Sequence, residues 1–294
     1  KDEKIPFENG LLGQETNGPG GMLKAFRTIP VILDIVKDIK ELAPNAWLIN
    51  FTNPAGMVTE AVLNYGKFDK IVGLCNVPVN LQMDCAKVFN KTADDFKFQF
   101  AGLNHFVWYT VADRKGNDLT YELWNKLQNK EEVGVKNIVN IDFDYEQIKN
   151  LGMLPCPYHR YYYLQDEMLK KSIKDWKEKG TRGEIVKKVE EELFELYKNA
   201  DLNEKPKQLE QRGGAYYSDA ACEIINGIYN DKGTIMVVNT KNKGAIDDLP
   251  YDAAVEISSY ITASGPKPIN FGKFPNSGQR GYIQVMKAME ELTV

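Results

Sequence analysis

The chain has 294 residues, of which 37 are Lys or Arg and 41 are Asp or Glu, so its formal net charge is −4. Because it has no long basic run, neither nucleic acid nor an anionic membrane surface is expected as a partner. No apolar stretch approaches the roughly 20 residues that a transmembrane helix needs. Hydrophobic residues make up 43% of a chain longer than one typical domain, which predicts one large or two closely packed domains.

The first part of the chain alternates strand and helix signals in the manner of a parallel sheet. Residues 11–22 are rich in glycine and predict a loop, and an amphipathic pattern predicts a helix over 23–42. Pro30 inside this helix predicts a kink or a split into two helices. Two short buried strands, each followed by a helix, are predicted in the order 46–51, 55–65, 70–75 and 76–90. Such sheets bind ligands at the carboxyl ends of their strands.

The pattern changes near residue 95, where we place the domain boundary, with 1–94 as one domain and 95–294 as the other. The second domain is predicted to hold antiparallel strands and a mainly helical middle. Its expected elements are strands over 96–101 and 105–112, a turn at 113–118, helices within 119–229, strands over 234–239 and 254–261, and a helix over 279–292.

Few side chains are available for soft-metal chemistry, since the chain has two histidines and four cysteines. The cysteines show no CxxC spacing, which favours reduced thiols and a cytoplasmic protein. Cys75 ends the second parallel strand, and His105 follows Asn104 at a polar break beside an apolar strand. Each taken alone is typical of a buried structural residue. If they meet, a thiolate and an imidazole form half of a coordination shell for Zn, Mn or Fe.

Three further positions have both a structural and a functional interpretation. Asn53 follows the first strand, where it either forms a turn or reaches a bound sugar or nicotinamide. Residues 158–163 contain four tyrosines, typical of packing unless a cation lowers one phenol's pKa from its usual value of about 10. Arg182 opens a predicted helix between glycines, which suits a phosphate or a solvated surface arginine.

Six blocks of the sequence, in order, resemble the NAD- and Mn-dependent glycoside hydrolases of family 4, most closely the 6-phospho-β-glucosidases. These blocks are GQETNGPGG at 13–21, AWLINFTNP at 46–54, GLCNVP at 73–78, GLNH at 102–105, YHRYYY at 158–163 and RGG at 212–214. The residues that begin at Cys75, CNVP, are similar to the phospho-β-glucoside type of the family.

The resemblance implies the fold of lactate and malate dehydrogenases, a Rossmann-like parallel sheet with a mixed α+β substrate domain. Residues 1–94 would be the remaining part of an NAD-binding domain and 95–294 the substrate domain. It also implies site roles. Cys75 and His105 would bind Mn²⁺, Asn53 and Arg182 would hold the substrate, and Tyr162 would be the base, with Glu15 supporting it and Tyr158 and Tyr161 left open as alternatives.

The implied reaction is hydrolysis of phosphorylated β-glucosides by a route without the usual carboxylate pair. NAD⁺ accepts hydride from C3, the C2 proton is removed, the aglycone is eliminated, water adds, and NADH returns the hydride. The resemblance further implies a small-molecule substrate and a homo-oligomer, either a dimer or a tetramer.

Two features depart from the family pattern. No GxGxxG motif follows a strand, so the first part of the Rossmann domain is expected to be missing from this sequence and the residues that bind NAD stay unassigned. Asn76 stands where the α-type enzymes carry an acid, and an amide cannot act as an acid. Two alternatives therefore stay open, an NAD-dependent 2-hydroxy-acid dehydrogenase and a non-catalytic protein that binds sugar phosphates.

Overall fold

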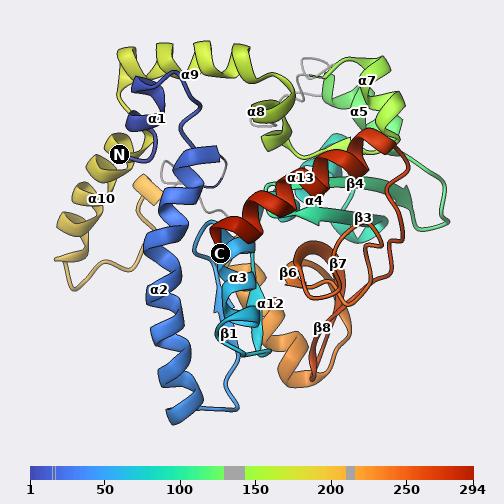
Figure 1. The fold of residues 1–294 in the computed structure, drawn as a ribbon. Coiled ribbons are helices and arrows are strands. Elements are labelled where there is room, and N and C mark those ends of the chain that lie inside the picture. The colour runs from blue at the N-terminus through green and yellow to red at the C-terminus, as the bar shows by residue number, and fades with distance from the viewer. Residues whose placement is uncertain (15, 17, 129–142, 210–215) are drawn as a thin grey trace.

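The computed structural model describes residues 1–14, 16, 18–128, 143–209 and 216–294, and these residues form an eight-stranded sheet flanked by helices (Figure 1). The strand order is β1-β2-β6-β7-β3-β4-β5, with β8 beside β7. Only the β1–β2 pair is parallel among the described strands. The strands are β1 Leu48–Asn50, β2 Ile71–Gly73, β3 Phe96–Leu103, β4 Phe106–Asp113, β5 Leu154–Pro155, β6 Thr234–Lys241, β7 Ala254–Thr262 and β8 Gly265–Pro268.

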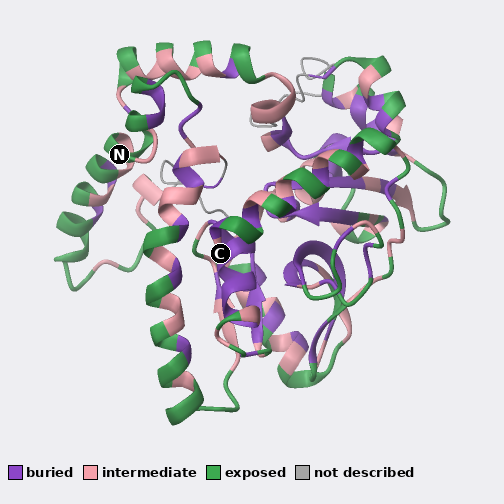
Figure 2. Ribbon diagram, in the orientation of Figure 1, coloured by how far each residue is buried: buried purple, intermediate pink, exposed green. Residues whose placement is uncertain are grey.

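Helices cover both faces of the sheet, and the sheet itself is largely buried (Figure 2). Consecutive side chains of a strand point to opposite faces, so Ile71 packs with Val36 and Val62 of α2 and α3, whereas Val72 packs with Ile224 of α12. The helices are α1 Lys4–Glu8, α2 Gly18–Leu42, α3 Ala55–Asn64, α4 Asn76–Val88, α5 Thr120–Gln128, α7 Tyr145–Leu151, α8 Arg160–Tyr163, α9 Gln165–Lys179, α10 Arg182–Tyr197, α12 Tyr217–Asn230 and α13 Ser277–Thr293.

Most of the predicted elements are confirmed. The strand–helix–strand unit forms as β1, α3 and β2, and the predicted antiparallel strands form as β3, β4, β6 and β7. The predicted terminal helix is α13, whose start is capped by the Asn276 side chain accepting a hydrogen bond from the Gly278 N–H at 2.7 Å. The short strands β5 and β8 were not predicted, because two to four residues carry too little periodicity.

Two predictions about the N-terminal region need correction. The loop predicted over 11–22 ends early, because α2 begins at Gly18. Of the two outcomes predicted at Pro30, a kink or a split, the split does not occur, since α2 continues through Pro30. The glycines are needed because the helix packs closely on the preceding segment: a Cβ on Gly21 would collide with the backbone of Thr16. Burial of Ala25, Ile29 and Val36 along one face stabilises α2 as a single helix.

The sheet runs across the predicted domain boundary near residue 95. Gly73 of β2 pairs with Asn239 of β6, so the parallel strands of the first part and the antiparallel strands of the second part share hydrogen bonds. The fold is therefore the predicted α/β arrangement with a mixed sheet, while the division into 1–94 and 95–294 stays a prediction.

Gly102 in β3 provides a stability test of the segment that precedes His105. Its φ is +155°, and a Cβ would lie 2.6 Å from Val107 Cα. Gly102→Ala is expected to lower the free energy of unfolding by about 2–4 kcal/mol, because strain and overpacking add. Gly116→Ala is the control, since its φ is +92° but a Cβ there meets no described atom within 4 Å. Equal losses in denaturant titrations of the two variants would contradict the close packing at Gly102.

Candidate functional site

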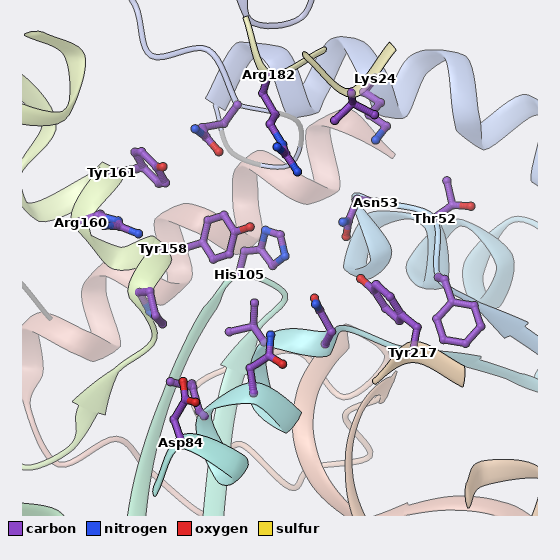
Figure 3. A pocket seen from close by; sticks show the side chains of 18 of the residues that line it. Lys24, Thr52, Asn53, Asp84, His105, Tyr158, Arg160, Tyr161, Arg182 and Tyr217 are labelled. Carbon is purple, nitrogen blue, oxygen red and sulfur yellow. The ribbon is translucent and has the colours of Figure 1, made fainter. Parts of the chain in front are cut away.

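A cavity of about 1040 Å³ lies at the carboxyl end of β1, beside the turn between β3 and β4 (Figure 3). Its wall draws on segments that are far apart in the sequence. Among the lining residues are Gln14, Lys24, Thr52, Asn53, Asn76, Asp84, His105, Tyr158, Tyr161, Arg182 and Tyr217. Of the predicted site residues, Asn53, His105 and Arg182 therefore line the same cavity.

His105 stands in the two-residue turn between β3 and β4, with a left-handed backbone at φ +60°. The side chain is buried, and burial, together with the positive charge of Lys24, lowers the pKa of His105 to about 3. The imidazole is thus neutral at neutral pH, the form that binds metals. Its Nδ1 atom is buried without a hydrogen-bond partner among the described residues.

Cys75 follows β2 and caps the N-terminus of α4, where its Sγ accepts a hydrogen bond from the Val77 N–H at 3.5 Å. Burial and the nearby Glu256 carboxylate raise the pKa of the Cys75 thiol well above its ordinary value, whereas hydrogen bonds from Val77 and the Asn104 side chain oppose the rise. Because Asn104 precedes His105, the thiol and the imidazole belong to one buried neighbourhood.

The donor set of this neighbourhood fits a transition metal. A sulfur ligand and a neutral imidazole suit Zn or Fe, whereas Mn²⁺ prefers oxygen ligands and would need them in the remaining coordination positions. The His105 Nδ1 atom has no protein partner among the described residues. No group of three His, Cys, Asp or Glu side chains able to hold a metal occurs in the described ranges. A metal held by Cys75 and His105 would therefore keep coordination positions open for substrate oxygens.

The structure separates the tyrosines of the 158–163 cluster. Tyr158 and Tyr161 line the cavity, and the Tyr158 ring stacks on the His105 ring with centroids 3.8 Å apart. Tyr162 is not in the cavity wall, because its ring packs against Phe106 at 4.8 Å. Among the tyrosines considered as the base, the geometry therefore favours Tyr158 and Tyr161 over Tyr162. Glu15, predicted to support the base, lies outside the described residues.

Arg182 lies at the start of α10, as predicted, and its side chain lines the cavity opposite His105 (Figure 3). The backbone amides of this helix start are already used: the N–H groups of Arg182 and Gly183 donate to the Glu3 carboxylate at 2.8 and 2.9 Å. A phosphate bound here would therefore contact the Arg182 guanidinium and not the backbone N–H groups at the start of α10. Lys24 of α2 lines the same end of the cavity and adds a second cation.

Asn53 and Thr52 form the wall at the end of β1, beside Phe51 and Tyr217, whose rings meet edge to face at 5.0 Å. This placement at a strand's carboxyl end fits one side of a nucleotide or sugar site. No GxGxxG motif follows a strand in the sequence to hold a pyrophosphate, so these residues account for only part of an NAD site.

Sequence reasoning missed Lys24 and Tyr217. Lys24 looks like any charged residue of an amphipathic helix, and nothing in its spacing indicates the cavity. Tyr217 stands near the RGG block, whose residues 212–214 lie outside the described ranges. Only the packing of α2 and α12 around the sheet brings these two side chains to the wall.

Two protein-family profiles match the chain. Residues 1–91 match "Family 4 glycosyl hydrolase", and residues 100–294 match "Family 4 glycosyl hydrolase C-terminal domain". The "Probable 6-phospho-beta-glucosidase" of Bacillus subtilis is 51% identical over 293 residues, an alignment covering 99% of this chain. The chain spans 66% of that relative's length.

Solved structures agree with these matches. The 6-phospho-beta glucosidase from Thermotoga maritima, in a structure with manganese, NAD⁺ and glucose-6-phosphate, superposes with a TM-score of 0.87 at 35% identity, over 99% of this chain and 67% of that chain. A malate dehydrogenase from Cryptosporidium parvum gives a TM-score of 0.52 at 11% identity, over 93% of this chain and 70% of that one. The latter likeness concerns the fold alone and confirms the predicted dehydrogenase-like architecture. No helix within the described ranges has the length and apolarity to cross a membrane.

Proposed function

The chain belongs to family 4 of the glycosyl hydrolases, and from this we propose that it forms the catalytic part of a 6-phospho-β-glucosidase that uses NAD⁺ and Mn²⁺. The observation that carries the proposal is the arrangement around one cavity: Arg182, His105 and Tyr158 line it, and Cys75, which is not among the lining residues, is buried beside Asn104 next to His105. The identity to the Bacillus subtilis relative and the CNVP residues at 75–78 support the β-glucoside class of substrate.

Each residue has a distinct task in this proposal. Cys75 and His105 would hold the metal, while the cations of Arg182 and Lys24 would bind the 6-phosphate at one end of the cavity. NAD⁺ would supply reversible oxidation at C3 of the sugar, and Mn²⁺ would supply Lewis-acid stabilisation of negative charge. Asn53 would hydrogen-bond to the bound substrate from the end of β1.

The base that removes the C2 proton is proposed to be Tyr158. Its ring covers His105, so its phenol stands beside the proposed metal ligand, where a cation would lower the phenol's pKa. Tyr161 also lines the cavity but is not stacked on His105. Asn76, also in the wall, can donate a hydrogen bond to the leaving oxygen but cannot protonate it as an acid would.

Replacing the tyrosines one at a time tests this choice. Tyr158→Phe is expected to lower kcat by about 10²–10⁴-fold, the usual contribution of a general base. Tyr162→Phe, which keeps the ring that packs on Phe106, is expected to leave kcat close to that of the unmodified chain. Steady-state rates on p-nitrophenyl β-glucoside 6-phosphate measure both. A large loss of kcat in Tyr162→Phe and none in Tyr158→Phe would identify Tyr162 as the base instead.

Removing the two cofactors tests the reaction class. Release of p-nitrophenol from the β-glucoside 6-phosphate, by a protein that contains this chain together with an intact nucleotide-binding loop, is expected to require both NAD⁺ and Mn²⁺. Chelation with EDTA should abolish the rate, and added Mn²⁺ should restore it, because metal binding is reversible. A rate that is unchanged without both cofactors would refute the oxidation–elimination route.

The same assay separates the two alternatives. A 2-hydroxy-acid dehydrogenase would need a catalytic His–Asp pair, but no such pair occurs in the part of the chain that the structure describes: His159 Nδ1 instead lies 3.4 Å from Cys156 Sγ. A non-catalytic sugar-phosphate protein would bind glucose 6-phosphate tightly and release no p-nitrophenol. No observation on the cavity favours either alternative over the glucosidase.

A cytoplasmic address and a homo-oligomeric state, dimer or tetramer, are also proposed. All four cysteines are free, which supports a reducing compartment. Apolar side chains on β6, β7 and α12 are exposed and would be covered in an oligomer; they are Ile225, Tyr229, Ile235 and Tyr260.

A further inference from the structure

The two proposed metal ligands follow strands that are not neighbours in the sheet. Cys75 comes two residues after the end of β2, and His105 comes two residues after the end of β3, with β6 and β7 lying between these strands. One row of residues paired across the sheet runs through β2, β6, β7 and β3. In β2 and β3 the row lies two or three residues before the proposed ligands. Its members, in order across the sheet, are Gly73, Asn239, Glu256 and Gly102.

Glu256 is the charged member of this row, and its carboxylate connects the strands. Its Oε1 atom accepts one hydrogen bond from Asn104 Nδ2 and another from Asn239 Nδ2, each at 3.0 Å. Glu256 is 1% exposed and Asn239 is fully buried. Asn104 is the residue before His105, so the carboxylate holds the turn that presents the imidazole.

The surrounding packing leaves the two amides little freedom. A Cβ on Gly56 of α3 would lie 3.0 Å from Asn104 Cβ and 3.6 Å from Asn239 Oδ1, and a Cβ on Gly73 would lie 2.8 Å from Asn239 Cβ. Glycines at these positions let α3 and β2 approach closely. The Glu256 hydrogen bonds are therefore made inside a tightly packed layer, and a side chain that loses them has no solvent with which to replace them.

We propose that Glu256 is a positioning residue for the metal pair, because its carboxylate fixes Asn104 and Asn239 and thereby presets His105 and Cys75 for one cation. The inference rests on the proposed function, since it assumes that these two residues bind Mn²⁺. Groups that orient metal-binding side chains without binding the metal themselves contribute about 10–100-fold to metal affinity. Glu256 thus acts on affinity and geometry without touching the metal.

The test is a titration of the 294-residue chain with Mn²⁺ in the absence of sugar and nucleotide, with free Mn²⁺ followed by electron paramagnetic resonance. Glu256→Gln removes the negative charge and replaces one oxygen by an N–H₂ donor, which would face either the Asn104 and Asn239 amides or the His105 backbone N–H that lowers the pKa of the Glu256 carboxyl group. The substitution is therefore expected to weaken Mn²⁺ binding by about 10–100-fold. Ser258→Ala is the matched control. Ser258 lies on the same strand, is 2% exposed, and accepts a hydrogen bond from the Phe100 N–H at 3.0 Å, away from the metal pair.

The absorption spectrum of bound Co²⁺ is a second measurement, and a general loss of folding stability would not shift its wavelength. Absorption from the thiolate–Co²⁺ bond reports the geometry at Cys75, and it is expected to shift in Glu256→Gln and to stay unchanged in Ser258→Ala. Asn104→Ala removes the hydrogen bond between Glu256 and the turn that carries His105. It replaces Glu256→Gln in both measurements if Glu256→Gln does not fold.

Different outcomes overturn different statements. If folded Glu256→Gln and Asn104→Ala both match Ser258→Ala in Mn²⁺ affinity and in the Co²⁺ spectrum, Glu256 has no positioning role. If Cys75→Ser and His105→Ala bind Mn²⁺ as tightly as the unmodified chain, or if the unmodified chain binds none, the metal pair itself is wrong and the inference falls with it.

Discussion

Cys75→Ser is expected to lower kcat/KM for p-nitrophenyl β-glucoside 6-phosphate by about 10³-fold, the effect of losing several kcal/mol of Lewis-acid stabilisation. Cys75 is 1% exposed at the start of α4, so the substitution exchanges sulfur for oxygen without opening the site to solvent. A serine hydroxyl is a poor ligand because it stays protonated where a metal-bound thiol loses its proton. Mn²⁺ affinity should therefore fall together with the rate.

The matched control for this experiment is Cys222→Ser, because Cys222 is exposed on α12 and lies away from the cavity wall. The control should keep both the rate and the Mn²⁺ affinity. A folded Cys75→Ser variant with full activity would refute the metal assignment. A variant with lost activity but unchanged Mn²⁺ affinity would show that Cys75 acts other than as a ligand.

The second large effect is on stability, at a buried ion network between α3 and α13. Lys287 Nζ contacts the Glu60 carboxylate, lies 2.7 Å from Glu290, and donates to the Ala254 carbonyl at 3.1 Å. All three charged side chains are buried. Lys287→Met is expected to lower the free energy of unfolding by about 3–5 kcal/mol at neutral pH, because it leaves two carboxylates without their cation.

The loss in Lys287→Met is expected to depend on pH in a definite direction. Burial raises the pKa of Glu290, and the adjacent Lys287 opposes that rise, so removing Lys287 raises the pKa further. A carboxyl group with a raised folded pKa contributes stability while it is protonated, below its unfolded pKa, and loses that contribution as the pH rises through the folded pKa. The deficit of the variant should therefore be smaller at about pH 5 than at about pH 8.

Urea titrations at the two pH values measure the deficit. Lys179→Met is the control for removing a paired lysine, because its partner Asp175 lies 2.9 Å away on an exposed helix face and no measurable loss is expected. Adding Glu60→Gln and Glu290→Gln to Lys287→Met should recover part of the loss. A deficit that grows toward low pH, or no recovery in the triple variant, would contradict this account of the network.

The sequence by itself determined the order of most elements and, through its resemblance to a known family, the kind of chemistry that we propose. Periodicity placed β1, α3, β2 and the antiparallel strands within a few residues of their bounds, because alternation and short apolar runs are local signals. Cys75 and His105 were considered as a pair because each stands at a polar break beside an apolar strand, and the family resemblance implied that they bind one metal. The split predicted at Pro30 as an alternative to a kink did not occur, since tertiary packing outweighed the local preference against proline in a helix.

Only the tertiary structure decided which residues share the cavity and how they are held. Tyr158, Tyr161 and Tyr162 are equivalent in the sequence, but rotation along one helical turn puts two in the wall and one against Phe106. Lys24 has no local signal, and Glu256 reads as one more strand residue. Their placement depends on pairing between strands far apart in the chain, Gly102 with Glu256 for example, and long-range register is set by packing of the whole sheet.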